Sequence, residues 1–132
     1  MKAISSATVT SAGAAYRHDI QTGRHTLVAD EPPQAGGQDA GPAPYDLLLA
    51  GLGACTAITL RMYAEKKGWD IGELRVELSF LKNREGDSRI ERTLHTDAVL
   101  NEAQWDKLLE IAGKTPVTKT LLEGVGITTA RG

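Results

Sequence analysis

A segment without a single charged residue, Leu47 to Leu60, limits most strongly how this chain can fold. Pro44 before it suits the first turn of a helix, where a missing N–H removes no hydrogen bond. Gly68 is typical of the position just beyond a helix end. The pattern therefore predicts a long helix from Tyr45 to about Lys67. Its first two thirds are apolar on every side, and a chain of 132 residues can hardly cover them alone. We therefore expect a second subunit to complete the cover.

Short strands are predicted on both sides of this helix. Before it, β-branched and alternating segments predict strands at residues 4–10, 14–20 and 24–30. Thr22-Gly23 suggests a hairpin turn between the last two strands. The segment 31–44 is rich in proline and glycine and is expected to be a connecting loop. After the helix, residues 73–81 alternate apolar and polar side chains and are expected to pair with residues 89–100.

A second, shorter helix is predicted near the carboxyl end. Asn101 and Gln104 resemble a capping box at its start, and Gly113 is expected to end it. Its apolar stripe is predicted to contain Trp105, Leu108, Leu109 and Ala112. A short helical turn from Pro116 and a last strand at residues 126–130 complete the order β-β-β-α-β-β-α-β. Because strands and helices do not alternate one for one, the predicted class is α+β.

Composition excludes several functional classes. The net charge is −2, so nothing attracts the chain electrostatically to nucleic acid or to an anionic membrane. The charge-free segment, at about 14 residues, is shorter than the roughly 20 residues that a membrane span needs. A single cysteine forms no internal disulfide, which favours a cytoplasmic location, and no signal peptide is evident. The histidines lie at no metal-ligand spacing, so we expect neither a metal nor a cofactor.

Residues 25–69 resemble the OsmC/Ohr family, and its OsmC-like branch in particular. The likeness rests on His25, the ADEP and GG motifs, the segment GPAPYDLL and the LGACT motif around Cys55. KTPVTKTL, residues 114–121, agrees more loosely. The resemblance implies a single OsmC-like domain over residues 1–132. It also implies an intertwined homodimer of antiparallel sheets with the long helix at its centre.

The best-known members of the family reduce organic and lipid hydroperoxides with two cysteines, assisted by an arginine and a glutamate. By this resemblance Cys55 matches the cysteine that attacks the peroxide. The second, resolving cysteine is replaced by Thr115. The glutamate position holds Tyr45, with Asp46 next to it, and the arginine position falls near Ala14, three residues before Arg17. Most of the family's catalytic set is therefore absent.

Peroxide reduction through Cys55 requires a thiolate, which an apolar environment disfavours. Cys55 lies about ten residues into the predicted helix, beyond the reach of the helix dipole, so a nearby cation is needed. Arg61 is a poor candidate because it lies on another side of the same helix. Arg17, Arg24 and His25 are the candidates to activate the thiol or line its pocket, with Tyr45 and Asp46 as further pocket residues.

Two functions stay open at this stage. In the first, the protein is a one-cysteine, thiol-dependent peroxidase for organic or lipid hydroperoxides, and an external thiol reduces Cys55 afterwards. In the alternative, the same dimer is a non-catalytic module for a hydrophobic small molecule, or a redox sensor. Cys55 also has a purely structural interpretation as a small buried hydrophobe. Thr115 has one as the N-cap of the helical turn that begins at Pro116.

Overall fold

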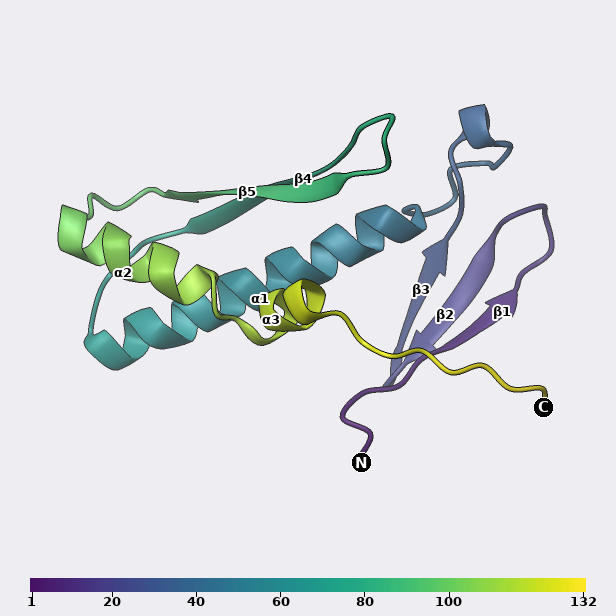
Figure 1. Cartoon of the computed structure of the whole chain (residues 1–132), viewed down its shortest axis with the longest axis horizontal. Coiled ribbons are helices and arrows are strands. Elements are labelled where there is room, and N and C mark those ends of the chain that lie inside the picture. Colours follow the sequence, from purple (N-terminus) through teal and green to yellow (C-terminus); the bar gives the residue numbers. More distant parts are fainter. The chain divides into compact units, whose positions relative to one another are not determined.

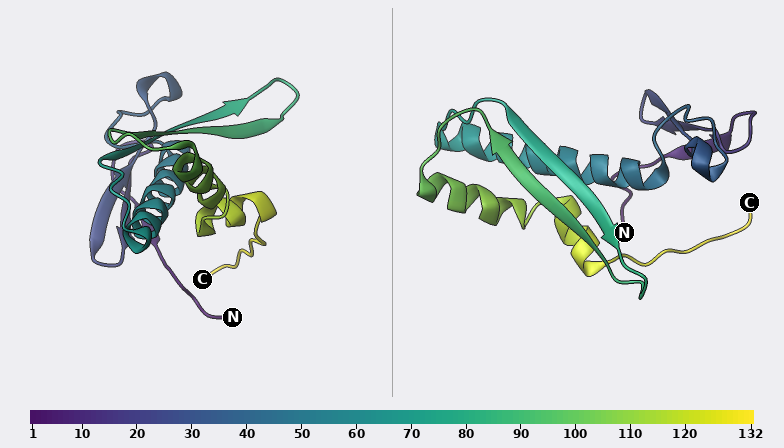
Figure 2. Two further views of the ribbon diagram at one scale, coloured as in Figure 1. Left: turned by 90° about the vertical axis from the view of Figure 1, so that its left-hand side faces the viewer. Right: turned by 90° about the horizontal axis from the view of Figure 1, so that it is seen from above.

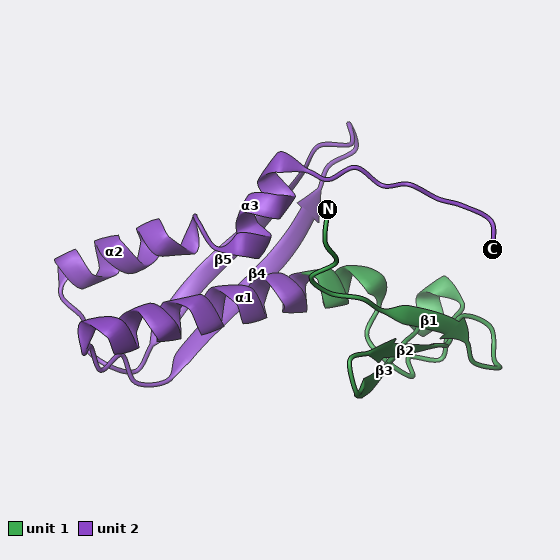
Figure 3. Cartoon of the chain, turned by 90° about the horizontal axis from the view of Figure 1, so that it is seen from below, with its two compact units in different colours: residues 1–48 green, residues 49–132 purple.

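The computed structural model describes all 132 residues, and they form two compact units, residues 1–48 and 49–132 (Figure 3). Along the chain the elements are β1 (Thr8–Ser11), β2 (His18–Thr22), β3 (His25–Ala29), a 3-10 turn (Pro33–Ala35), α1 (Pro44–Lys67), β4 (Leu74–Lys82), β5 (Ser88–Thr96), α2 (Glu102–Ala112) and α3 (Pro116–Glu123) (Figure 1). The predicted α+β class is confirmed.

The predicted last strand is wrong. Residues 126–130 carry no strand, and Ile127 is 86% exposed. A strand needs a neighbouring strand to satisfy its backbone N–H and C=O groups, and this segment has none in the single chain.

The first unit contains a three-stranded antiparallel sheet in the order β1-β2-β3. Thr22 pairs with His25, so the two residues of the β2–β3 turn are Gly23 and Arg24, one position later than predicted. Gly23 has a φ of +58°, a conformation that two-residue hairpin turns require and that glycine adopts without strain.

The loop that follows β3 is built around the buried carboxylate of Asp30. Its Oδ2 accepts hydrogen bonds from the backbone N–H groups of Gln38 (3.2 Å) and Ala40 (3.1 Å). The chain passes so close to itself that a Cβ at Gly37 would lie 1.9 Å from the carbonyl oxygen of Glu31. As predicted, the segment is irregular apart from the single 3-10 turn. Its GG motif is explained by this close approach.

In the second unit the β4–β5 hairpin lies over α1 and α2, which run side by side (Figures 1 and 2). The fully buried core joins these elements and contains Leu60, Ala64, Ile71, Leu108 and Ala112. Leu74, Val76, Leu78 and Phe80 are the less exposed side chains of β4, as the predicted alternation requires. Gly53 allows α1 to approach the hairpin, because a Cβ there would lie 2.8 Å from Cδ1 of Leu78.

Helix α1 confirms its predicted bounds within one residue and ends before Gly68, whose φ is +69°. One edge of the helix is buried and consists of Leu52, Thr56, Leu60 and Ala64. Its 24 residues exceed the charge-free segment, so by length and composition it could cross a membrane, contrary to the prediction from that segment alone. Core helices of soluble proteins share this property, and the buried edge of α1 packs into such a core.

Helix α2 begins with the predicted capping box. Asn101 accepts from the backbone N–H of Gln104 at 2.8 Å, and the Gln104 side chain accepts from the backbone N–H of Asn101 at 3.0 Å. Gly113 follows the last residue of the helix. The predicted stripe is correct for Leu108 and Ala112 but wrong for Leu109, which is 56% exposed. Leu109 lies one residue from the core-facing Leu108, so the helix turns it toward solvent.

Candidate functional site

Cys55 lies in the middle of α1, in the second unit, and its side chain is half-buried. It neighbours the buried edge of the helix through Thr56, which is 0% exposed. The Thr56 hydroxyl donates to the backbone carbonyl of Leu52 at 2.7 Å. Cys55 is the one thiol of the chain, and partial burial leaves it within reach of a small molecule.

Arg92 on β5 brings a guanidinium to this part of α1. It occupies the inward register of the strand, between Ile90 and Leu94, and pairs across the hairpin with Leu78. Its Nη1 donates to the hydroxyl of Thr56 at 2.9 Å, one residue from Cys55. A side chain of β5 is thereby attached directly to the helix that carries the thiol.

Arg92 belongs to a buried polar cluster that we call the Arg92 cluster: Thr56, Arg92, Thr115, Thr118 and the carbonyl group of Ala112. The Nη1 of Arg92 also donates to the Thr118 hydroxyl at 2.9 Å, and its Nη2 donates to the Ala112 carbonyl at 2.8 Å. The hydroxyls of Thr115 and Thr118 lie 2.6 Å apart. The cluster thus joins α1, β5, the end of α2 and the start of α3.

Thr115 departs from the role predicted for it from capping rules. It stands at the N-cap position of α3, but its side chain makes no capping hydrogen bond. Its hydroxyl is instead bonded to the Thr118 hydroxyl, and the residue is 1% exposed. The tertiary contact with Thr118, which leads on to Arg92, takes precedence over the local cap.

The electrostatics of the cluster connect Arg92 with Cys55. Burial lowers the pKa of the Arg92 guanidinium, because it removes water from the charged form. Negative charge at Cys55 acts in the opposite direction and raises the pKa of Arg92.

The other residues predicted for the site belong to the first unit. Arg17 lies 3.7 Å from the carboxylate of Asp19 and also helps to lower the pKa of Asp30. Arg24 is in the β2–β3 turn, and His25 is the exposed first residue of β3. Their predicted role toward the thiol stays a prediction.

Tyr45 and Asp46 lie in the first turn of α1. The Asp46 carboxylate accepts from the backbone N–H of Ala43 at 3.1 Å, which agrees with a charge that stabilises the helix start. Tyr45 is 58% exposed. Both residues stay predicted pocket residues. No group of three or more His, Cys, Asp or Glu side chains gathers where a metal could bind.

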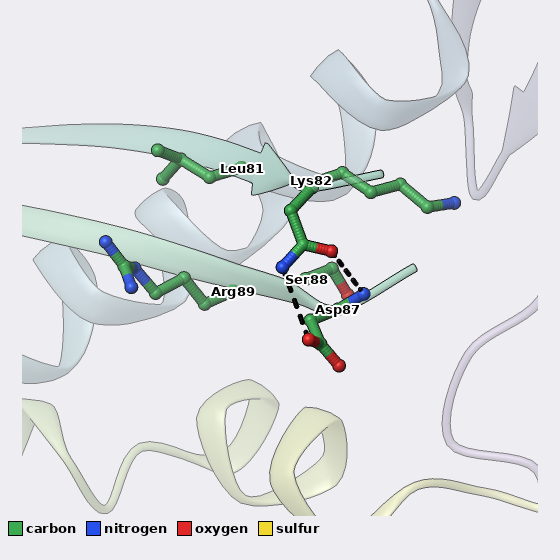
Figure 4. Close-up of a pocket in the computed structure, with 6 residues that line it drawn as sticks. Leu81, Lys82, Asp87, Ser88 and Arg89 are labelled. Carbon is green, nitrogen blue, oxygen red and sulfur yellow. Dashed lines mark hydrogen bonds between the residues drawn. The ribbon is translucent and has the colours of Figure 1, made fainter. Parts of the chain in front are cut away.

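A shallow pocket lies at the tip of the β4–β5 hairpin (Figure 4). It is lined by Leu81, Lys82, Asn83, Asp87, Ser88 and Arg89. Hydrogen bonds between Asn83 and Asp87, drawn as dashed lines, hold the turn together. These residues are exposed and none belongs to the Arg92 cluster, so this pocket reflects the construction of the turn.

Sequence reasoning missed Arg92 and Thr118. A signal for Arg92 was present in the segment RIERTLHT, because the alternation of β5 places Arg92 in the same register as Ile90 and Leu94. A charged residue among inward apolar ones marks a side chain that needs buried polar partners. No comparable local signal identifies Thr118, since its contact with Arg92 joins residues far apart in the sequence.

Comparison with known proteins gives a consistent result. The model of the OsmC-like protein family matches residues 36–130, whereas no curated protein matches the chain. Among solved structures, a Psychrobacter arcticus protein assigned to the osmotic stress and detoxification response is similar at a TM-score of 0.78 and 18% identity, over 91% of this chain and 90% of that one. An OsmC-like protein from Mycoplasma pneumoniae is similar at a TM-score of 0.72 and 18% identity, over 92% of this chain and 89% of that one. An organic hydroperoxide resistance protein OsmC from Legionella pneumophila is similar at a TM-score of 0.65 and 22% identity, over 91% of each chain.

Proposed function

The chain belongs to the OsmC-like protein family, and on that premise we propose that it reduces organic or lipid hydroperoxides through Cys55 and serves in oxidative-stress defence. The observation that carries the proposal is the half-buried thiol on α1, inside the matched region and next in sequence to Thr56, whose hydroxyl accepts a hydrogen bond from Arg92. A thiolate, the reactive form of cysteine, is favoured by a neighbouring positive charge. The Legionella relative, described as a hydroperoxide resistance protein, supports the same substrate class.

The reaction follows from thiolate chemistry. The Cys55 thiolate attacks one peroxide oxygen, an S–O bond forms as the O–O bond breaks, and the leaving alkoxide takes up a proton to become an alcohol. The sulfur is oxidised to a sulfenic acid, and the hydroperoxide is reduced. A first external thiolate then attacks the sulfenic sulfur, and the displaced hydroxide leaves as water. A second external thiolate attacks the external sulfur of this mixed disulfide and releases the Cys55 thiolate.

An external reductant is required because the chain has no other cysteine. The hydroxyl of Thr115 stands where the family has its resolving thiol, and a hydroxyl cannot form a disulfide. Each hydroperoxide that is reduced therefore consumes two thiols of a separate molecule, with a dithiol as the simplest candidate.

The proposed assembly is a homodimer, and the location is the cytoplasm. The side of α1 opposite its buried edge exposes Ile58 and Met62, which are 54% and 60% accessible in the single chain. A second copy would cover these apolar side chains. Arg17, Arg24, His25, Tyr45 and Asp46 are proposed as pocket residues in that assembly.

The test is hydroperoxide consumption with cumene hydroperoxide and dithiothreitol. We expect catalytic turnover by the wild type and its complete loss in Cys55→Ser, which keeps the size of the side chain but removes the thiol. Thr59→Ser is a matched control on the same helix and should retain turnover. A wild type that consumes no peroxide above the rate without protein would contradict the proposal.

Labelling of oxidised Cys55 distinguishes the alternative functions from the peroxidase. The absence of a second cysteine and of the family's glutamate at Tyr45 favours a redox sensor or a binding module. Dimedone labels sulfenic acids, so mild oxidation followed by mass spectrometry distinguishes the cases. Labelling of Cys55 without turnover indicates a sensor, whereas the absence of labelling indicates a module in which the thiol is inert.

A further inference from the structure

We propose that α3 and the tail behind it form a strap, residues 115–132, which the hydrogen bond between Arg92 and Thr118 holds on the second unit and which opens while the core stays folded. The inference concerns a conformational change and does not depend on the proposed function. It follows from the way α3 is attached, which differs from the way α1, α2 and the hairpin are held together.

The apolar core of the second unit does not include α3. The core cluster and the half-buried hydrophobic residues packed against it come from α1, α2, the β4–β5 hairpin and the segments between them. The buried residues of the strap are threonines, Thr115 at 1% and Thr118 at 8% exposure. Among the apolar side chains of α3, Val117 is half-buried, whereas Leu121 and Leu122 are 38% and 78% exposed. Apolar packing stabilises most helices, but it contributes little to the attachment of α3.

Hydrogen bonds take the place of apolar packing at this contact. The Nη1 of Arg92 donates to the Thr118 hydroxyl at 2.9 Å and thereby joins α3 to β5. The Thr118 oxygen also lies 3.3 Å from the carbonyl oxygen of Ala112, the last residue of α2. Its third neighbour, the Thr115 hydroxyl at 2.6 Å, belongs to the strap itself. The docked position of α3 therefore depends mainly on the hydroxyl of Thr118.

Arg92 keeps its place when Thr118 leaves. Its Nη1 also donates to the Thr56 hydroxyl at 2.9 Å, and its Nη2 donates to the Ala112 carbonyl at 2.8 Å. Water can replace Thr118 as the acceptor for the freed N–H group once the strap opens. Because folding exchanges such a bond with water for one within the protein, its net contribution to stability is small. The attachment of α3 is therefore weak enough to open locally.

The strap can move about the link that follows Lys114. Up to that residue the chain is held on α2, because the backbone N–H of Lys114 donates to the carbonyl of Ile111 at 2.9 Å. The Nζ of Lys114 also lies 3.1 Å from the carboxylate of Glu110. At the other end, residues 125–132 take part in no hydrogen bond or ion pair, and Ile127 is 86% exposed. The tail therefore does not hold α3 in place.

The experiment is hydrogen exchange of the backbone amides in the full chain, measured by NMR under conditions in which the rate reports the opening equilibrium. The amides of residues 119–122 report on α3, and the first of them, Lys119, donates to the carbonyl of Thr115 at 3.0 Å. The amide of the fully buried Leu108 reports on the core. We expect residues 119–122 to share one protection factor, because the strap opens as one body, and this factor should be lower than that of Leu108.

Thr118→Val tests the hydrogen bond and keeps the β-branched shape of the side chain. It deprives Arg92 of an acceptor in the docked state only, so exchange at residues 119–122 should become about tenfold faster. Thr120→Val makes the same change at an exposed position of α3 and is the matched control, which should leave these rates unchanged. In an Arg92→Gln background, Thr118→Val should add little, because both substitutions remove the same bond.

Ile71→Val tests whether the strap opens separately from the core. Ile71 is fully buried, so its loss of a methyl group should accelerate exchange of the Leu108 amide about fivefold. It should not affect residues 119–122, because the core stays packed when the strap opens. Equal acceleration of both sets would show that α3 is released only by global unfolding and would overturn the proposal. Equal effects of Thr118→Val and Thr120→Val would overturn it as well.

Discussion

At the scale of single residues, Asp30 shows how one carboxylate can organise a long loop. Backbone hydrogen bonds from Ala40, Glu31 and Gln38 lower the pKa of Asp30 below its ordinary value of 3.8, with the contact from Ala40 as the largest cause. Because the folded pKa is depressed, the stabilisation is complete above the unfolded value and is lost as the pH falls through the folded one. The loop of the GG motif should therefore loosen in strong acid.

We predict that Asp30→Asn lowers the urea midpoint of unfolding at pH 7, because a neutral amide presents one acceptor oxygen where the carboxylate presents two. The difference from the wild type should shrink as the pH falls below about 4. Hydrogen exchange of the Gln38 and Ala40 amides reports the same effect locally. Asp39→Asn, in the same loop, changes an exposed carboxylate at a φ of +54° that asparagine tolerates. A loss as large in Asp39→Asn as in Asp30→Asn would contradict the assignment.

At the scale of elements, the start of α2 is held by its reciprocal capping box. Asn101→Ala removes the acceptor for the Gln104 N–H, so we predict a loss of about 1 kcal/mol in the free energy of unfolding. Chemical denaturation at neutral pH measures it. Asn101→Ser keeps a capping oxygen and should recover most of the loss. Equal stabilities of the alanine and serine variants would show that the cap contributes nothing.

Elements defined by local chemistry could be predicted from the sequence. The bounds of α1 follow from Pro44 and Gly68, and the start of α2 follows from Asn101 and Gln104, because each signal acts within a few residues. The prediction of a strand at residues 126–130 failed because a strand needs a neighbouring strand to pair with its backbone. The capping hydrogen bond predicted for Thr115 is absent for a similar reason: its hydroxyl bonds to the side chain of Thr118, which accepts from Arg92 of the distant β5.

The candidate site could likewise be predicted from the sequence only in part. The sequence offered Cys55 through a family resemblance and required a cation beside it on general grounds. It did not identify the Arg92 cluster, because the approach of β5 to α1 is decided by tertiary packing. The register of β4 and β5, in which Arg92 faces Leu78, is the fact that the sequence pattern alone left open. An inward arginine in an alternating strand is nevertheless a signal that can be sought in advance.

At the scale of the whole molecule, the second unit has more apolar surface than its own core covers. Leu52 and Leu60 of α1 are buried, whereas Ile58 and Met62 remain more than half exposed on another side of the helix. Contiguous exposed apolar side chains on a long helix are typical of a protein interface. A second copy of the chain would turn α1 into a helix that is covered on every side.

We predict that the wild type sediments at twice the 14.1 kDa mass of the chain, and that Ile58→Asp combined with Met62→Asp shifts it to the monomer. Burial of two carboxylates without partners in an apolar contact opposes association strongly. Val99→Asp is a suitable control, because Val99 is fully exposed outside the helices and should keep the dimer. Circular dichroism verifies that each variant retains its helices. If the wild type is monomeric at micromolar concentration, or the double variant remains dimeric, the exposed side of α1 is not the subunit contact.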